Sequence, residues 1–222
     1  IRAFNIPIVE KTGYEADDLV GTWARIAQEK DFDVVMVTGD KDFKQLITDR
    51  CTLWDPMKDT IINRQDIMDD MGIEPLQFID VLGLAGDTSD NIPGVAGVGP
   101  KTAVKLISEF GSIDGIYENL ETLKKKKKLY ENLSSSRHIV KLSRELATID
   151  TKVLVKESIE DFKLEPFDNK KAFELFQQFE FKKLATEFAQ SADKTEKIYK
   201  LVSTVKELER LAHVLENKAV FA

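Results

Sequence analysis

The sequence contains very little cysteine and histidine. Cys51 is the only cysteine among the 222 residues, so no disulfide can form within the chain, and a reducing compartment such as the cytosol fits this composition. The two histidines, His138 and His213, lie in C-terminal stretches with a helical pattern, where surface or packing roles are expected. The sequence therefore offers no Ser-His-Asp or Cys-His arrangement for nucleophilic catalysis.

Long apolar runs and an excess of positive charge are also missing. No run is long enough to span a bilayer, so no membrane partner is expected. The chain begins IRAFNIPIVE, without an initiator methionine or a signal-peptide pattern, which predicts a start inside a larger protein.

The net charge of −7 argues against a nucleic-acid partner unless acids gather at one site and bases elsewhere. Lys124 to Lys128, KKKKK, is one basic block, which fits a solvated loop or a DNA contact equally well.

The hydrophobic spacing of the first third predicts an α/β fold. Strands are expected at residues 6–10 (IPIVE) and 34–38 (VVMVT), with a helix over residues 19–29 between them. The continuous apolar run at 34–38 indicates a strand buried on both faces. CTLWD and TIIN predict a hairpin or two edge strands. This order predicts a mainly parallel central sheet flanked by helices.

From residue 64 onward the pattern is helical. The predicted helices cover residues 74–86, 100–111 and 129–149, and one or two more lie in residues 169–188. Pro100 fits the first turn of the second of these helices, and Gly111 fits the position just after its end.

The sequence divides into four predicted parts. Residues 1–63 form the α/β core, residues 64–189 a helical subdomain, residues 190–197 a polar linker, and residues 198–222 the start of another domain. In that last part, IYKLVS and AVFA predict strands. Thr204 and Glu207 match a capping box before a helix between them.

Seven carboxylates stand where an α/β sheet commonly holds ligands. They form three groups: Glu15, Asp17 and Asp18; Asp40 and Asp42; Asp87 and Asp90. The first two groups follow predicted strands, whose carboxyl ends form the usual ligand side of such a sheet. Ligand sets made only of oxygen select hard cations such as Mg²⁺ or Mn²⁺. For any single group, simple capping of a helix or turn is the alternative.

Carboxylates that lie close together need compensating charge to stay ionised. Two divalent ions would cancel about four of these charges, and two ions roughly 4 Å apart can hold the attacking and leaving oxygens of a phosphodiester in line. The pattern therefore predicts metal-assisted phosphodiester hydrolysis with two ions. A metal-dependent phosphatase for small molecules stays open, because Asp40-Lys-Asp42 follows a predicted strand.

The glycine-rich stretch GVAGVGPKT, residues 94–102, nearly matches a nucleotide-binding P-loop. Pro100 interrupts that match, and no strand precedes it. A helix-hairpin-helix fits better, because its glycine hairpin joins two helices and directs backbone N–H groups at a DNA phosphate. The predicted DNA-binding residues are Gly94, Gly97, Gly99, Lys101 and Thr102. An ordinary turn between helices is the alternative.

Together, GYEADD, TGDKD, GDTSDNIPGVAGVGPKTA and the later LATI resemble the flap endonuclease family, in the form of the 5′-nuclease domain of bacterial DNA polymerase I. The resemblance covers roughly residues 1–190, and GDTSDNIPGV–GVG–KTA is specific to this family. It implies a PIN-like 5′-nuclease fold and the seven acids as catalytic metal ligands. It also implies a potassium ion at the helix-hairpin-helix.

The resemblance further implies 5′–3′ exonuclease and flap endonuclease activity in RNA-primer removal and DNA repair. The implied substrates are 5′ flaps, nicked or gapped duplexes and RNA-primer/DNA junctions. A monomer in the bacterial cytoplasm, associated with the nucleoid, is expected. The tail from Ile198 resembles the start of a 3′–5′ exonuclease-like domain. Polymerase activity can be assigned only to a parent protein.

One departure from the family affects the expected activity. Family members have further residues before Ile1, which include a strand with another metal-ligand aspartate and a basic helical arch. The chain alone is therefore expected to have weak or no activity, with apolar sheet edges left exposed. A non-catalytic DNA-binding fragment, which keeps the hairpin without a working metal centre, remains the alternative.

Overall fold

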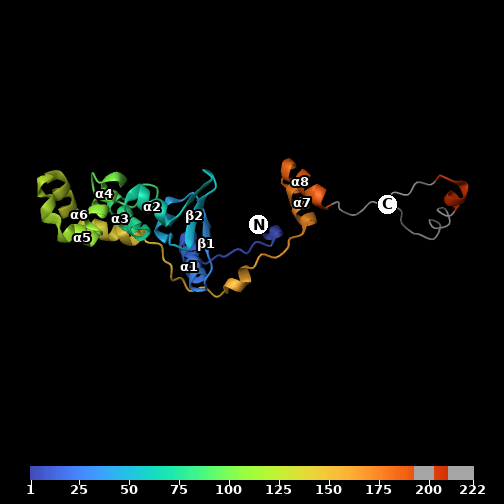
Figure 1. The fold of residues 1–222 in the computed structure, drawn as a ribbon, viewed down its shortest axis with the longest axis horizontal. Coiled ribbons are helices and arrows are strands. Elements are labelled where there is room, and N and C mark those ends of the chain that lie inside the picture. Colours follow the sequence, from blue (N-terminus) through green and yellow to red (C-terminus); the bar gives the residue numbers. More distant parts are fainter. Residues whose placement is uncertain (193–202, 210–222) are drawn as a thin grey trace. The chain divides into compact units, whose positions relative to one another are not determined.

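The computed structural model describes residues 1–192 and 203–209. It contains two compact units (Figure 1). Residues 7–163 form one unit, and residues 1–6 together with residues 164–192 form the other. The larger unit spans the predicted boundary between residues 63 and 64, and the four-part division stays a prediction.

The larger unit begins with a helix and a three-stranded sheet. Helix α1 covers Ala16–Glu29, and the strands are β1 (Val34–Val37), β2 (Cys51–Asp55) and β3 (Thr60–Ile62). The strand order is β1-β2-β3. β1 and β2 are parallel, with Val34 opposite Cys51, and β2 and β3 are antiparallel. The parallel pairing is confirmed in β1 and β2, and β2 and β3 form the hairpin, one of the two expected arrangements.

Two expectations for the strands are wrong. Residues 6–10 lie in no strand, because an extended segment becomes a strand only when a neighbour pairs with it, and no ladder includes these residues. The Glu15 group therefore does not follow a strand. β1 is not buried on both faces: Met36 is buried, whereas Val35 and Val37 are each 57% exposed. Alternate side chains point to opposite faces, and only one face packs against the core.

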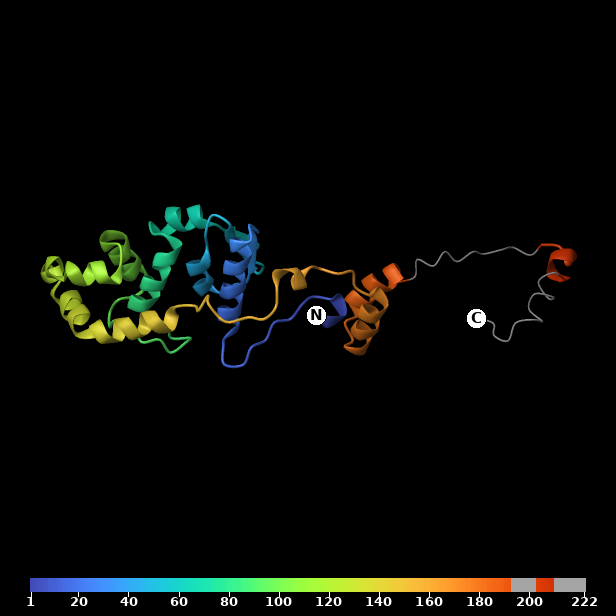
Figure 2. The same cartoon turned by 90° about the horizontal axis from the view of Figure 1, so that it is seen from below.

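The remainder of the larger unit is mainly helical. Its elements are α2 (Arg64–Met71), η3 (Pro75–Gln77), α3 (Phe78–Ala85), α4 (Pro100–Phe110), α5 (Ile113–Glu118), η4 (Leu120–Lys125) and α6 (Lys127–Ala147). Figures 1 and 2 show α3 to α6 gathered into one helical group. As predicted, α4 starts at Pro100 and Gly111 follows its end with a positive φ of 81°. Leu84, Ile107 and Leu133 are completely buried in this group.

The segment after α6 joins the helical group to α1 and the sheet (Figure 2). The buried Thr22 hydroxyl accepts the Val153 N–H at 3.1 Å and donates to the Asp150 carbonyl at 3.3 Å. Gln45, in the short helix η2 (Lys41–Leu46), donates to the Ala147 carbonyl and accepts the Ile149 N–H, both at 3.0 Å. These bonds fix the end of α6 beside η2, and the segment after α6 beside the middle of α1.

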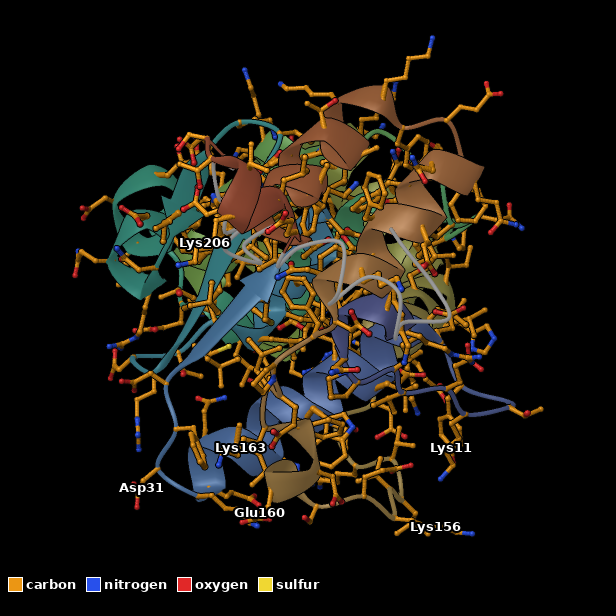
Figure 3. All side chains as sticks on the ribbon, turned by 90° about the vertical axis from the view of Figure 1, so that its right-hand side faces the viewer. Lys11, Asp31, Lys156, Glu160, Lys163 and Lys206 are labelled. Carbon is orange, nitrogen blue, oxygen red and sulfur yellow. The ribbon has the colours of Figure 1, made fainter. Side chains whose placement is uncertain are left out.

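Residues 154–163 then return along α1. The short helix η5 (Ile159–Phe162) carries Glu160, whose carboxylate lies 3.2 Å from Lys30 Nζ. Figure 3 shows η5 and its labelled Glu160 beside the C-terminal end of α1. The Phe162 ring meets Trp23 edge to face, with 4.4 Å between centroids. No helix of the described residues combines the length and apolarity needed to cross a membrane.

The smaller unit packs around aromatic rings. Its elements are η1 (Arg2–Phe4), α7 (Asn169–Gln178) and α8 (Lys182–Ala192). The Phe4 ring lies 4.7 Å from that of Phe167, 5.9 Å from Phe176 and 5.6 Å from Phe188.

Two expectations concern the C-terminal stretch. Residues 190–192, expected in the linker, belong to α8, and residues 193–197 lie outside the described residues. The predicted strand at 198–203 lies almost wholly outside them, and AVFA does so entirely. The capping box is confirmed: the Thr204 N–H donates to Glu207 Oε2 at 3.2 Å, and the Glu207 N–H donates to Thr204 Oγ1 at 3.3 Å.

Candidate metal centre

The three predicted acidic groups meet at one cleft of about 540 Å³. Six of the seven acids line it: Glu15, Asp17, Asp18, Asp40, Asp42 and Asp90. The seventh, Asp87, is only 6% exposed. Asp42, Asp87 and Asp90 each offer one carboxylate oxygen, and these oxygens lie within 4.8 Å of one another. In the described part of the chain, this is the one group of three or more potential ligands at such spacing.

A short closed loop presents Asp87 and Asp90. The Asp87 N–H donates to the Ile92 carbonyl at 2.9 Å, and the Ile92 N–H donates back to the Asp87 carbonyl at 2.7 Å. Inside the loop, Asp87 Oδ1 accepts the Ser89 N–H at 2.8 Å, and Asn91 adopts a φ of 58°. Asparagine tolerates this left-handed conformation better than most residues. The loop therefore holds both aspartates by local hydrogen bonds.

Asp40 and Asp42 are held at the start of η2. Asp40 Oδ1 accepts the Asp42 N–H at 2.9 Å, so Asp40 also caps this short helix. Asp42 Oδ1 is buried and has no hydrogen-bond partner among the described residues. The pKa of Asp42 is raised to about 6, chiefly by burial and secondly by the negative charge of Asp40. A buried carboxylate oxygen without a partner is costly, and a bound cation would remove that cost.

Lys41 contacts the acidic group beside the cleft, and the sequence analysis missed it. Its Nζ lies 2.5 Å from Asp87 Oδ2. Hydrogen bonding to Lys41 lowers the pKa of Asp87, and the same contact raises the pKa of Lys41. One ammonium cannot neutralise three carboxylates, so the group keeps a negative charge. A lysine between two aspartates in TGDKD was the available signal.

The first helix contributes acids of two kinds. Burial raises the pKa of Asp17, with further contributions from Asp40, Glu15, Asp18 and Asp90, which shows that the three acidic groups face one another. Asp18 has a structural function: Oδ2 accepts the Glu15 N–H at 3.2 Å, and Oδ1 accepts the Asp150 N–H at 2.9 Å. For Asp18, capping and metal binding are therefore compatible roles, since a carboxylate oxygen has two lone pairs.

Two further acids, Glu145 and Asp150, also line the cleft. Glu145 lies on α6 and Asp150 in the segment that follows it. Both reach the cleft because that segment is bonded to α1. No local sequence pattern reports such a tertiary contact, so the sequence carried no signal for these residues.

The three glycines of the hairpin between α3 and α4 have different reasons for being glycine. Gly94 is buried with a φ of 60°, and a Cβ there would lie 2.4 Å from the Gly86 nitrogen, so packing of the loop accounts for it. Gly97 has a φ of 75°, which favours glycine. Gly99 has an ordinary φ of −89°, and a Cβ there would meet nothing within 4 Å. The fold alone therefore does not require glycine at 99.

The hairpin tip is fixed to α6. Asn132 Nδ2 donates to the Ala96 carbonyl at 2.6 Å. The Gly94 N–H donates to Ser143 Oγ, also on α6, at 3.2 Å. Of the predicted side-chain contacts, Lys101 is exposed and Thr102 is half-buried on the first turn of α4. This arrangement leaves Gly99 and Lys101 accessible and buries Gly94.

Comparison with known proteins identifies the family. The 5′–3′ exonuclease N-terminal resolvase-like domain matches residues 1–72, and the 5′–3′ exonuclease C-terminal SAM fold matches residues 73–170. The DNA polymerase I of Rhizobium leguminosarum is 35% identical over 192 residues, which cover 86% of this chain and 19% of that protein. That of Streptococcus pneumoniae (strain ATCC BAA-255 / R6) is 41% identical over 180 residues, which cover 79% of this chain and 20% of that protein. The chain thus spans about a fifth of the length of these relatives.

Solved structures show the same fold at lower identity. The 5′-exonuclease of T5 with zinc bound is 22% identical with a TM-score of 0.58, and the match covers 84% of this chain and 63% of that one. A bacteriophage T5 flap endonuclease variant in complex with DNA and metal ions is 22% identical with a TM-score of 0.54, covering 82% of this chain and 61% of that one. These matches support the predicted α/β class with a helical subdomain. Both halves of the family match in their natural order, and relatives more than a third identical cover most of the chain, so the chain belongs to the 5′–3′ exonuclease family.

Proposed function

We propose that this chain is the nuclease part of a protein related to DNA polymerase I, and that it hydrolyses phosphodiester bonds at 5′ ends and 5′ flaps of DNA. The observation that carries the proposal is the group of Asp42, Asp87 and Asp90, with oxygens within 4.8 Å and one buried Asp42 oxygen without a partner. Family membership supports it, as do similar structures with divalent metal ions and with DNA.

The acids of the cleft suit a hard divalent cation, Mg²⁺ or Mn²⁺, because their ligand atoms are carboxylate oxygens. Asp42, Asp87 and Asp90 are the proposed ligands of one ion. Glu15, Asp17, Asp18 and Asp40 are the proposed ligands that complete a two-ion site. An ion bound there polarises a phosphoryl oxygen and lowers the pKa of a bound water.

The chain's own charges explain why a cation is needed. A phosphodiester carries a negative charge, and the cleft acids repel it when no cation is bound. Lys41 alone leaves the group negative. The hairpin is proposed to hold a neighbouring phosphate through its backbone near Gly99 and the side chains of Lys101 and Thr102. Because Gly99 has no side chain, a phosphate can approach the backbone closely.

The finer parts of the proposal concern substrates and surroundings. The proposed substrates are 5′ flaps, nicked or gapped duplexes and RNA-primer/DNA junctions, cut by a monomer associated with the nucleoid in the bacterial cytoplasm. A potassium ion at the hairpin is part of the same proposal. Replacing potassium by sodium at equal ionic strength should then weaken DNA binding, and equal affinity in both salts would remove this ion from the proposal.

The main test is cleavage of an end-labelled 5′-flap duplex by the full-length gene product, with Mg²⁺ or with EDTA. Mg²⁺-dependent cutting near the flap junction is expected. Asp90→Asn should reduce the rate of cleavage by at least about 100-fold. A bound metal stabilises the transition state by several kcal/mol, and the substitution weakens one of its ligands. Asp90 is exposed and makes no hydrogen bond to the described residues, so the fold should be unaffected.

Asp70→Asn is the matched control, because Asp70 is an exposed aspartate on α2 outside the cleft. Cutting that persists in EDTA, or an Asp90→Asn protein as active as the control, would contradict the proposal. DNA binding without cutting by any form would favour a non-catalytic binding protein. Turnover of small phosphoesters but not of DNA would favour the phosphatase alternative.

A further inference from the structure

The lysine block, defined as Lys124 to Lys128, spans the end of η4 and the first turn of α6. All five side chains are exposed. Lys124 pairs with Glu121, and Lys127 Nζ lies 4.0 Å from Glu131. The side chains of the other three make no hydrogen bond or ion pair with the residues that the structure describes: Lys125, Lys126 and Lys128. The two nearby acids thus leave a positive surface unneutralised.

The fold gains little from the three unpaired lysines. α6 begins at Lys127 with no side-chain cap and no acid in its first turn. The N-terminus of a helix carries a partial positive charge, so lysines there are repelled by the helix as well as by one another. In contrast, the first turn of α1 carries Asp17 and Asp18. Stability therefore does not explain why lysine occupies five successive positions.

The hairpin lies next to this block. Asn132, which donates to the Ala96 carbonyl, is four residues after Lys128 on the same helix. Residues four apart share one face of a helix, and four residues advance about 6 Å along its axis. A Cβ on Gly97 would lie 3.5 Å from Asn132 Nδ2, so the hairpin tip sits one turn from Lys128.

This spacing fits a nucleic-acid backbone. Phosphates of one strand of duplex DNA advance about 3.4 Å each along the axis, so about 6 Å corresponds to roughly two phosphates. A lysine side chain can reach across such a step. A strand whose phosphate lies at the hairpin would therefore bring its next phosphates to the unpaired lysines.

We propose that Lys125, Lys126 and Lys128 form a second DNA-contact surface, which continues from the hairpin and holds the following phosphates of the same duplex. The contact is electrostatic and independent of base sequence. This inference rests on the proposed function, because it takes the hairpin to bind a DNA phosphate. The lysine block would contact the part of the duplex that lies beside the hairpin, and not the part that enters the cleft.

The test is fluorescence anisotropy of a labelled 5′-flap duplex with the full chain in EDTA, titrated over a range of salt concentrations. The test variant carries Lys125→Gln, Lys126→Gln and Lys128→Gln. It should bind about tenfold more weakly at low salt. The slope of log affinity against log salt should become shallower by about 2 to 3, because each lost phosphate contact removes about 0.9. The thermal midpoint should be unchanged or higher, since like charges leave the start of α6.

The matched control carries Lys156→Gln, Lys163→Gln and Lys171→Gln, three exposed lysines that belong to neither the hairpin nor the lysine block; Figure 3 labels the first two. It changes net charge equally and should keep the wild-type slope. If the test variant has the same affinity and slope as the control, the block is a solvated loop and the inference fails while the proposed function stands. The inference would also fail if the test variant bound single-stranded RNA more weakly than the wild type but bound the duplex with unchanged affinity. No duplex binding by the wild type would overturn the inference, whereas the proposed function is decided by the cleavage assay with Mg²⁺.

Discussion

The cleft and the hairpin end of the larger unit differ in charge and in construction. The cleft is lined by acids from α1, η2, the loop at residues 87–92 and the end of α6. The hairpin end offers glycine backbone, Lys101 and the lysine block. Both are proposed to meet the same negatively charged polymer. The net charge of −7 therefore describes neither region, and the cleft can attract phosphate only with a bound cation.

The two regions also differ in what a substitution would damage. In the cleft, the proposed function is carried by side chains at the ends of elements, and Asp90 makes no hydrogen bond to the described residues. In the hairpin, the proposed function depends on the backbone path, and Gly94 packs directly against the Gly86 backbone. We therefore expect side-chain changes to alter chemistry in the cleft and backbone changes to alter folding in the hairpin.

The strongest test of this contrast compares two glycines of the hairpin. Gly94→Ala should destabilise the protein by at least about 3 kcal/mol, because alanine is strained at positive φ and its Cβ would collide with the Gly86 backbone. Gly99→Ala should leave stability nearly unchanged, since its φ is ordinary and space is open. Urea unfolding followed by circular dichroism measures both changes.

Gly99→Ala should nevertheless weaken duplex binding, because a methyl group would stand where a phosphate is proposed to approach the backbone. Anisotropy with the labelled duplex measures this effect. Wild-type affinity for Gly99→Ala would show that the tip does not contact DNA, and a stable Gly94→Ala protein would show that packing does not require this glycine.

The next test asks whether Lys41 competes with the metal. Lys41→Met removes an ammonium that lies 2.5 Å from Asp87, so a divalent cation should bind about tenfold more tightly. Without metal, the variant should be less stable, because the buried Asp87 loses its partner. Isothermal titration with Mn²⁺ and thermal unfolding in EDTA measure the two effects.

Lys58→Met provides a matched control for Lys41. Lys58 Nζ lies 2.7 Å from Asp55, another buried aspartate, but neither residue lines the cleft. The control should lose stability without a change in Mn²⁺ affinity. Weaker Mn²⁺ binding by Lys41→Met would instead show that Lys41 supports the metal ligands rather than competing with the ion.

The sequence predicted those features that depend on neighbouring residues. Pro100 and Gly111 bounded α4 correctly, because caps are local, and all seven acids lie at or beside the cleft. The strand expected at residues 6–10 was wrong, because a ladder partner cannot be inferred from an apolar run alone. Glu145 and Asp150 were missed for the same reason, since contacts between distant segments bring them to the cleft. The sequence also did not distinguish the packed Gly94 from the open Gly99.

The smallest expected effect concerns the proton on Asp42. Its pKa is about 6 in the folded, metal-free protein and 3.8 as the ordinary value. The folded state therefore binds more protons than the unfolded state between these values, and the stability contributed by this group is lost as the pH rises through about 6. The contribution of Asp87 to stability depends on pH in the opposite direction. Because its pKa is lowered in the folded state, its contribution is lost as the pH falls.

Asp42→Asn should remove the part of the pH dependence of stability that Asp42 causes. In EDTA the variant should be more stable than the wild type above about pH 6, by about 1 kcal/mol after allowance for solvent screening of a half-buried group, and equal to it near pH 4. Urea unfolding at both pH values measures the difference. Mg²⁺ should reverse the order at the higher pH, because only the wild-type carboxylate gains a cation. An equal gain at both pH values would assign the effect to packing, and failure of Mg²⁺ to reverse the order would remove Asp42 from the metal ligands.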